Sequence, residues 1–194
     1  MAKKIKPTFL GVYLRNNGIE RLDIYFKTSI IISKLEKLSN NKANLNVYNF
    51  YLIAKSSKDN ISQKEVNDMA EFVFQEYNTK EIDMQTLVKG DKELSKFGQF
   101  VINFLHTQKS LADGADINEI QFGNLMYAAT DKNLIAVDLF LTCKTLKQDF
   151  AQVLETICGH LQLNSPERQE ELRLEYEAKL AIAKTKRDSE RGKE

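Results

Sequence analysis

The chain has 194 residues, of which 42% are hydrophobic and 28% are charged, and its formal net charge at pH 7 is +1. A chain of this size can bury the core of one domain, or of one domain with an appendage, without disulfides. The composition excludes a largely disordered chain, the short apolar runs exclude a membrane span, and the near-zero charge removes the basic excess typical of nucleic-acid-binding domains.

The first predicted element is a β-hairpin over residues 8–26. A two-residue turn would pair Leu14 with Arg21 and mix apolar with charged groups, whereas a three-residue loop ending at Gly18 gives one apolar face. The loop needs a left-handed residue at its last position, so Gly18 is predicted to have a positive φ. The predicted core face comprises Leu10, Val12, Leu14, Leu22, Ile24 and Phe26.

Three elements follow in the first half. Residues 28–38 predict a short helix, although the β-branched run Ile30-Ile31-Ile32 is more typical of a strand. Residues 45–54 predict a strand that is central, because bulky side chains alternate on both faces. Ser62 and Glu65 have the spacing of a capping box and predict a helix to about Tyr77. Its apolar stripe is Val66, Met69, Ala70, Val73, Phe74 and Tyr77.

The middle of the chain is less sharply patterned. Residues 92–108 predict a helix after the Gly90-Asp91 break, and residues 111–119 predict a loop. For residues 122–129 a strand is preferred to a helix capped by Asp116, because the following segment 130–133 is turn-like.

The densest apolar segment lies between residues 134 and 161. Period-two alternation over residues 134–143 predicts a buried strand, and Thr145 with Gln148 predicts the capping box of a helix that follows directly. The alternative is one continuous helix from Asp131, which would be apolar all round between residues 134 and 141.

The C-terminal segment carries the clearest helix start, because Ser165 is a good N-cap and Pro166 fits the first helical position. Its acidic residues dominate the first half and its basic residues the second, which complements the helix dipole. Its apolar residues form two narrow stripes on roughly opposite sides: Leu172, Tyr176, Leu180 and Ala183 on one, and Leu174, Ala178 and Ala181 on the other.

A helix that only closes its own core usually has one broad apolar arc. The two stripes therefore predict that residues 166–191 project from the domain and are stabilised by a partner, either another copy or a different protein. The alternative is a helix packed flat along the domain through its Leu172 stripe.

Side chains able to do chemistry are few and scattered. His106 and His160 have no ligand spacing with cysteine or carboxylate. Cys143 and Cys158 fall on or beside apolar faces, which indicates buried thiols rather than a disulfide framework or metal ligands. The segment 113–119 lacks the spacing of a calcium loop, and residues 89–92 lack that of a phosphate loop. We therefore expect no catalytic residue, cofactor or metal.

A nucleic-acid interface is the alternative function. Aromatic residues on the predicted strands could stack on bases, and lysines nearby in sequence could contact phosphates. The aromatic residues are Tyr13, Tyr25, Tyr48, Phe50 and Tyr51, and the lysines are Lys3, Lys4, Lys6, Lys27 and Lys55.

Together these patterns predict an α+β fold with about five mostly antiparallel strands packed by helices, and a long projecting C-terminal helix. Residues 1–163 are predicted to form the globular domain and residues 164–194 the charged helix. We expect a non-enzymatic interaction, assembly or accessory protein, cytoplasmic and not membrane-bound, which binds a protein partner or forms an oligomer through its C-terminal helix and a sheet edge. The expected partner-binding residues are Leu172, Leu174, Tyr176, Leu180, Ala181 and Ala183.

Overall fold

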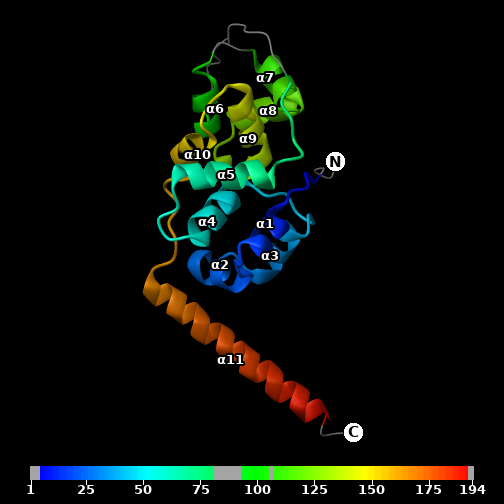
Figure 1. Ribbon diagram of the computed structural model, residues 1–194, viewed down its shortest axis with the longest axis vertical. Coiled ribbons are helices and arrows are strands. Elements are labelled where there is room, and N and C mark those ends of the chain that lie inside the picture. The colour runs from blue at the N-terminus through cyan, green and yellow to red at the C-terminus, as the bar shows by residue number, and fades with distance from the viewer. Residues whose placement is uncertain (1–4, 81–92, 105–106, 192–194) are drawn as a thin grey trace.

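The structure, a computed structural model, describes residues 5–80, 93–104 and 107–191. These residues form eleven α-helices and one 3-10 helix, without any sheet. The predicted α+β fold with about five strands is therefore wrong. The long C-terminal helix is confirmed, and it extends away from one end of the packed helices (Figure 1).

The helices fall into two consecutive groups of five and a final long helix. The first five are α1 (Leu10–Asn16), α2 (Arg21–Thr28), α3 (Ile32–Ser39), α4 (Val47–Ser57) and α5 (Gln63–Val73). The next group comprises α6 (Lys96–Val101), α7 (Gln108–Gly114), α8 (Glu119–Met126), the 3-10 helix η1 (Asp131–Asn133), α9 (Ala136–Thr145) and α10 (Phe150–Cys158). The last helix, α11, spans Pro166–Arg191.

The helices α1–α5 and α6–α10 form two units that share four matching helix–helix contacts. In the first unit α1 packs on α3 and α5, and α2 packs on α3 and α4. In the second unit α6 packs on α8 and α10, and α7 packs on α8 and α9. The same five-helix arrangement therefore occurs twice in the chain.

The two units also share local backbone features at corresponding positions, and each corresponding pair is separated by the same number of residues. A Cβ atom at Gly11 would lie 2.4 Å from the carbonyl oxygen of Ser39 at the end of α3, and one at Gly98 would lie 2.2 Å from that of Met126 at the end of α8. Glycine allows these two close approaches because it has no side chain. Both α2 and α7 are also followed by a residue with positive φ and then by a buried isoleucine: Ser29 and Ile30, and Asp116 and Ile117.

The two units meet along a shared axis. The segments before α4 and α9 pair in an antiparallel bridge, where the Val47 amide donates to the Leu134 carbonyl at 2.9 Å and the Ala136 amide to the Leu45 carbonyl at 2.8 Å. These two bonds occupy equivalent places in the two units. The bridge thus joins like segments of the repeat around an approximate two-fold relation.

An aromatic cluster fills the core between the units. It consists of one phenylalanine from each of four elements: Phe50 of α4, Phe74 at the end of α5, Phe140 of α9 and Phe150 of α10. The ring centroids of neighbouring members lie 5.2–5.7 Å apart, and all four side chains are buried. Because both units contribute, neither has a core of its own that is separate from the other.

The predicted hairpin over 8–26 is wrong, and the helices α1 and α2 take its place. The residues Leu10 and Leu14 fit both a strand face and a helix face, since their separation is a multiple of two and also one helical turn. In a strand, Val12 would lie on the same face as Leu10 and Leu14. Val12 is instead 37% exposed while Leu10 and Leu14 are buried, as expected for a helix. The positive φ predicted for Gly18 is confirmed at 63°, but it lies in the turn between two helices.

The predicted strands over 45–54, 122–129 and 134–143 are also helices, namely α4, α8 and α9. Every residue of α9 from Ala136 to Cys143 is buried, so this helix is enclosed around its whole circumference. A fully buried helix has no polar face to reveal its period, and an apolar run then fits a strand equally well. The α8 cap is Asn118, not Asp116.

The helix predictions are partly confirmed. The capping box of Ser62 and Glu65 opens α5 as predicted. The Thr145–Gln148 capping box is wrong, because Thr145 ends α9 and Asp149 caps α10, so a continuous helix from Asp131 is absent as well. Within the predicted helix 92–108, α6 ends at Val101, and the predicted loop 111–119 contains the end of α7 and the start of α8.

The residues 28–38 contain the predicted helix in shortened form, because α3 begins at Ile32 and ends at Ser39. Among the described residues, no helix combines the length and the apolar character needed to cross a membrane.

Candidate functional site: the terminal helix and its root

The helix α11 is attached to the rest of the protein at one end only. The connecting residue Asn164 lies against the end of α2, where its backbone amide donates to the Lys27 carbonyl at 2.7 Å. Its side-chain amide donates to the Phe26 carbonyl at 2.7 Å and to the Ser29 hydroxyl at 2.8 Å. Helix ends leave carbonyl groups without partners in the helix, and Asn164 satisfies two of them at α2.

The first turns of α11 pack on α2 through Leu172, Arg173 and Tyr176. Leu172 is 3% exposed, and the ring of Tyr176 meets that of Phe26 edge to face with centroids 6.2 Å apart. The guanidinium of Arg173 lies 5.4 Å from the centre of the Phe26 ring. We name Asn164, Leu172, Arg173 and Tyr176 the root of α11.

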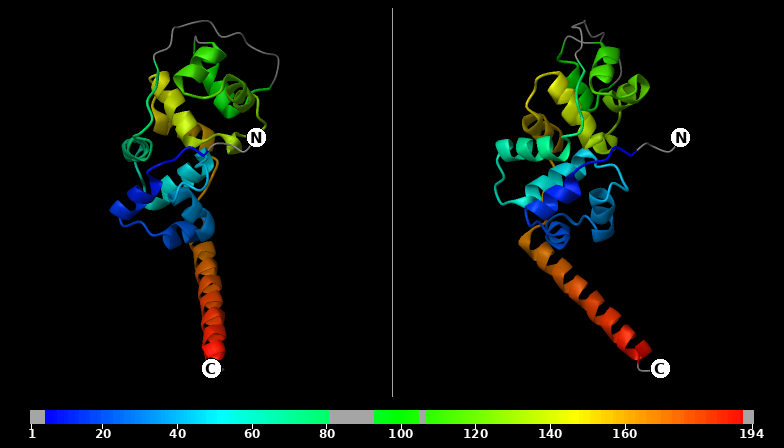
Figure 2. Two further views of the ribbon diagram at one scale, coloured as in Figure 1. Left: turned by 90° about the vertical axis from the view of Figure 1, so that its right-hand side faces the viewer. Right: turned by 45° about the vertical axis from the view of Figure 1, so that its right-hand side comes forward.

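Beyond the root, α11 extends into solvent without touching another helix (Figure 2). The side chains of Leu174, Leu180 and Ile182 are 59%, 53% and 70% exposed. These three are among the eight large hydrophobic side chains that are exposed in the described part of the chain. Part of the exposed apolar surface thus lies on α11, where no other described part of the chain covers these three side chains.

The predicted partner-binding residues therefore fall into two groups. Leu172 and Tyr176 belong to the root and lie on the protein's own α2. Leu174, Leu180, Ala181 and Ala183 are exposed on the projecting part. The alternative of a helix packed flat along the domain is wrong, because contact with the domain ends after the first turns.

Local interactions hold the first half of α11 in helical form. The Ser165 hydroxyl accepts a hydrogen bond from the Arg168 amide at 3.3 Å, as an N-cap does. Arg168 pairs with Glu171 at 2.8 Å, and Glu170 lies 3.8 Å from Arg173. Such exposed pairs contribute only a few tenths of a kcal/mol each.

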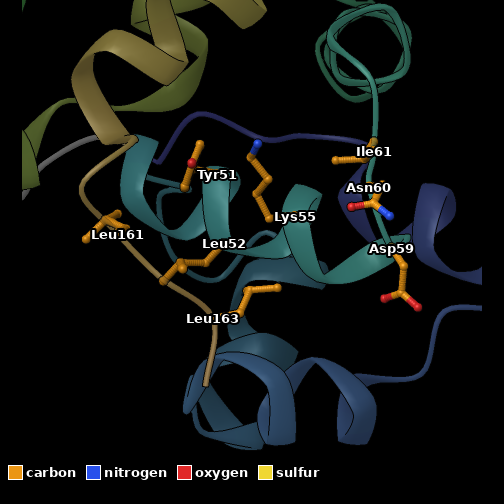
Figure 3. A pocket seen from close by; sticks show the side chains of 8 residues that line it. All are labelled: Tyr51, Leu52, Lys55, Asp59, Asn60, Ile61, Leu161 and Leu163. Atoms are coloured by element: carbon orange, nitrogen blue, oxygen red, sulfur yellow. The ribbon is translucent and has the colours of Figure 1, made fainter. Parts of the chain in front are cut away.

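An open groove of about 390 Å³ lies beside the connection from α10 to α11 (Figure 3). Its walls are α4, the loop after α4 and the connecting segment. The lining residues are Tyr51, Leu52, Lys55, Asp59, Asn60, Ile61, Leu161 and Leu163. Figure 3 shows Leu161 and Leu163 on one side of the groove and Asn60 and Ile61 on the other.

The charges at this groove are already paired within the protein. Glu155 accepts a hydrogen bond from the Tyr51 hydroxyl at 3.0 Å and forms an ion pair with Lys55 at 3.0 Å. Asp59 lies 3.4 Å from Lys27. Burial, followed by the hydrogen bond to Glu155, raises the pKa of Tyr51 above its usual range, so this hydroxyl does not ionise near neutral pH. The groove offers apolar contacts and no free acid or base.

A second group of polar side chains lies where α6, η1 and the end of α10 meet. The Lys96 ammonium donates to the Ile157 carbonyl at 3.1 Å and lies 3.4 Å from Nδ1 of His160. His160 packs edge to face on the Tyr48 ring at a centroid distance of 5.6 Å. A lysine at the last carbonyls of a helix offsets the negative end of the helix dipole, which accounts for Lys96 structurally.

The two cysteines are buried thiols, as predicted. Burial, together with the nearby Asp131 carboxylate, raises the pKa of Cys158 to about 12. Burial also raises the pKa of Cys143 above its usual range. A thiol must ionise to act as a nucleophile, so neither group is prepared for catalysis. His160 is exposed while Cys158 is buried, so the two do not form a reactive pair.

The residues proposed to contact nucleic acid do not form one surface. Phe50 and Tyr51 are buried, so their faces are not open to bases. Lys6, Lys27 and Lys55 pair with Asp138, Asp59 and Glu155, whereas Lys3 and Lys4 lie outside the described residues. Phosphate contacts would have to compete with these ion pairs.

The sequence did not predict the ion pair between Lys6 and Asp138. Lys6 lies 2.9 Å from Asp138, whose carboxylate is fully buried in α9, and the Lys6 backbone amide donates to the Asn44 side chain at 2.8 Å. The sequence signal was an aspartate within an otherwise apolar run. The pair ties the N-terminal segment to the core, and it is a structural feature. His106 lies outside the described residues.

The described residues contain no group of histidine, cysteine and carboxylate side chains suited to a metal ion. Comparison of the chain with protein-family models, with curated proteins and with solved structures found no match. The candidate site is therefore defined by its own geometry, as a helix held at its root with an exposed apolar surface beyond it.

Proposed function

We propose that this protein is a non-enzymatic interaction or assembly protein, and that the projecting part of α11 binds a protein partner. The observation that carries the proposal is that α11 is docked only through its root, while Leu174, Leu180 and Ile182 are more than half exposed. Exposed large apolar side chains on a projecting helix are typical of interaction sites, and an amphipathic helix is a common binding element.

The free energy of the helix also supports a partner. Helices without tertiary contacts are marginal in water even with good caps, and the projecting part of α11 lacks such contacts. Burying one leucine or isoleucine side chain contributes about 1.5–3 kcal/mol. Burial of the exposed apolar residues in a partner interface would therefore stabilise α11 more than its exposed ion pairs do. Partner binding is then the step that makes this part of the helix fully stable.

The proposal also includes a non-enzymatic role and a cytoplasmic location. We favour a non-enzymatic role because the polar side chains at the groove and near Lys96 are engaged in ion pairs, helix ends or ring contacts. We place the protein in the cytoplasm because its two thiols are free and buried apart from each other, as in proteins of reducing compartments. We do not propose nucleic-acid binding, because no geometric feature of the described residues favours it.

The test compares two double variants of the full chain with the same change in charge. Leu174→Glu with Ile182→Glu places acids on the exposed apolar surface, whereas Lys179→Gln with Lys186→Gln removes charge from another side of α11. We expect the first variant to lose its partner in pull-down and light scattering, while the second retains it. Circular dichroism should show unchanged helix content in both. Retention of every partner by the Leu174→Glu, Ile182→Glu variant would contradict the proposal.

A further inference from the structure

We infer that the partner of α11 is a second copy of this chain, and that two α11 helices pair antiparallel. This inference rests on the proposed function and names the occupant of its binding surface. It is carried by three properties of the projecting helix: the spacing of its apolar residues, the division of its charges, and the side from which it is docked.

The contact seam of the pair is formed by Leu174, Ala178, Ala181 and Thr185. These residues follow one another at separations of four, three and four, which is the heptad spacing of helices that pack side by side. All four are exposed in the structure. The two alanines allow close approach of the helix axes at the centre of the seam, and Ile182 borders it and adds apolar area.

The seam and the root lie on opposite sides of α11. Leu172 and Tyr176 face α2, whereas Leu174 and Ala178 are about half a turn away from them on the helix, at 100° per residue. A second helix can therefore cover the seam while the root stays docked. Pairing requires no rearrangement of the domain.

The charges of α11 favour the antiparallel direction. Its first half, residues 166–178, contains five glutamates and two arginines, and its second half, residues 179–191, contains five basic and two acidic residues. Antiparallel helices place each acidic half beside the basic half of the other copy. Parallel helices would place like halves together, which destabilises the pair.

The seam also sets a register. When Ala178 lies opposite Ala181 of the other copy, Leu174 lies opposite Thr185 of that copy. The flanking positions then pair Glu177 with Lys184 of the other copy, and this pair occurs twice by symmetry. A parallel pair would instead bring Glu170 beside Glu175 of the other copy. In the antiparallel register the second helix ends opposite residue 168, close to where α11 begins at Pro166.

The first experiment measures the mass of the full chain by sedimentation equilibrium from micromolar to millimolar concentration. The wild type should form a dimer. Glu177→Lys and Lys184→Glu should each weaken dimerisation on the order of tenfold, because two attractive pairs become repulsive. The double variant Glu177→Lys, Lys184→Glu should regain wild-type affinity, and an equimolar mixture of the two single variants should form a heterodimer. Lys179→Glu, which lies off the seam, is the control and should dimerise normally.

The second experiment determines direction by disulfide formation. Native Cys143 and Cys158 are buried, so an introduced cysteine is the accessible thiol. A mixture of Leu174→Cys and Thr185→Cys chains should form a mixed disulfide under mild oxidation. Each variant alone should crosslink poorly, because the equivalent residues of an antiparallel pair lie about three helical turns apart. Strong crosslinking of Leu174→Cys with itself would overturn the antiparallel arrangement.

The failure of this inference is distinguishable from failure of the proposed function. Self-pairing is contradicted if the wild type stays monomeric at all concentrations. It is also contradicted if neither Glu177→Lys nor Lys184→Glu changes the affinity of the dimer. If such a protein still loses a different bound protein through Leu174→Glu with Ile182→Glu, the interaction role stands with another occupant. If that double variant loses nothing, both proposals fail.

Discussion

At the scale of single residues, the polar side chains of this protein act mainly on the ends of helices. Among the described residues, seven helices begin with a side chain that accepts a hydrogen bond from the first turn: Asn46, Ser62, Ser95, Thr107, Asn118, Asp149 and Ser165. Each satisfies backbone amides that have no acceptor within the helix. In a fold of many short helices, such caps are needed often, because each helix adds two ends.

The cap of α5 gives a pH-dependent prediction. Hydrogen bonds from Lys58 and from Ser62 lower the pKa of Glu65 from 4.5 to about 2. A folded-state pKa below the unfolded value means that this stabilisation is present above pH 4.5 and is lost as the pH falls towards 2. The variant Glu65→Gln keeps an acceptor but has no charge, so it should be less stable than the wild type at neutral pH.

The measurement is urea unfolding of wild type and Glu65→Gln between pH 2 and pH 7, the range that contains both pKa values. The difference in unfolding free energy should shrink as the pH falls through this range. Glu71→Gln is a suitable control, since Glu71 is exposed and makes only a surface ion pair with Lys144. A difference that is constant with pH would show that the Glu65 charge does not support the cap.

At the scale of elements, most helices are too short to be stable alone. The helices α1, α2, α3, α6, α7 and α8 have six to eight residues each, which is below the length at which isolated helices persist. They exist because each buries apolar side chains against a neighbour. The helix α11 is the opposite case, with 26 residues and only its root packed.

This contrast predicts different results for two truncations of α11. A chain ending at Glu177 keeps the root and should retain the wild-type melting temperature. A chain ending at Asn164 loses the buried Leu172 side chain and the ring contact of Tyr176 with Phe26. It should lose about 2 kcal/mol and melt roughly 4–8 °C lower.

Both truncated chains should lose the partner, because both lack the projecting part of α11. Thermal melting followed by circular dichroism, combined with light scattering, measures the two effects separately. Equal melting temperatures for the two truncations would show that the root does not stabilise the domain.

At the scale of the whole molecule, the two five-helix units share one core. The cluster of Phe50, Phe74, Phe140 and Phe150 takes two rings from each unit, and the Leu45 and Leu134 segments are hydrogen-bonded to each other's unit. Removal of one unit would expose the aromatic side chains of the other. The repeat is therefore a feature of the chain's architecture and does not divide it into independent domains.

We predict that the two units unfold together. Phe150→Ala should destabilise the protein by about 3–5 kcal/mol, since it removes a buried ring that contacts Phe50, Phe74 and Phe140. Wild type and variant should each show one calorimetric transition whose van't Hoff and calorimetric enthalpies agree. Phe150→Leu is the control, because it keeps a large apolar side chain at the same buried position and should lose less stability. Two separate transitions in the wild type would show that the units are independent.

The sequence alone determined the elements that carry their own local signals. Ser62 and Glu65 begin α5, Ser165 and Pro166 begin α11, and Gly18 has a positive φ. Each of these features depends on residues close together in the chain. The exposed surface of α11 was predictable for the same reason, because its two narrow stripes are a property of one helix.

Tertiary structure decided the fold class. The apolar run 134–143 is compatible with a strand or a helix by pattern, and only its burial on every side, between two repeated units, makes it the central helix α9. The residues Leu10 and Leu14 likewise fit both periods until the exposure of Val12 is known. The pairing of Lys6 with Asp138 and the ring contact of Tyr176 with Phe26 join residues far apart in sequence. Local patterns contain no information on such contacts, because the free energy that selects them arises only when the segments pack together.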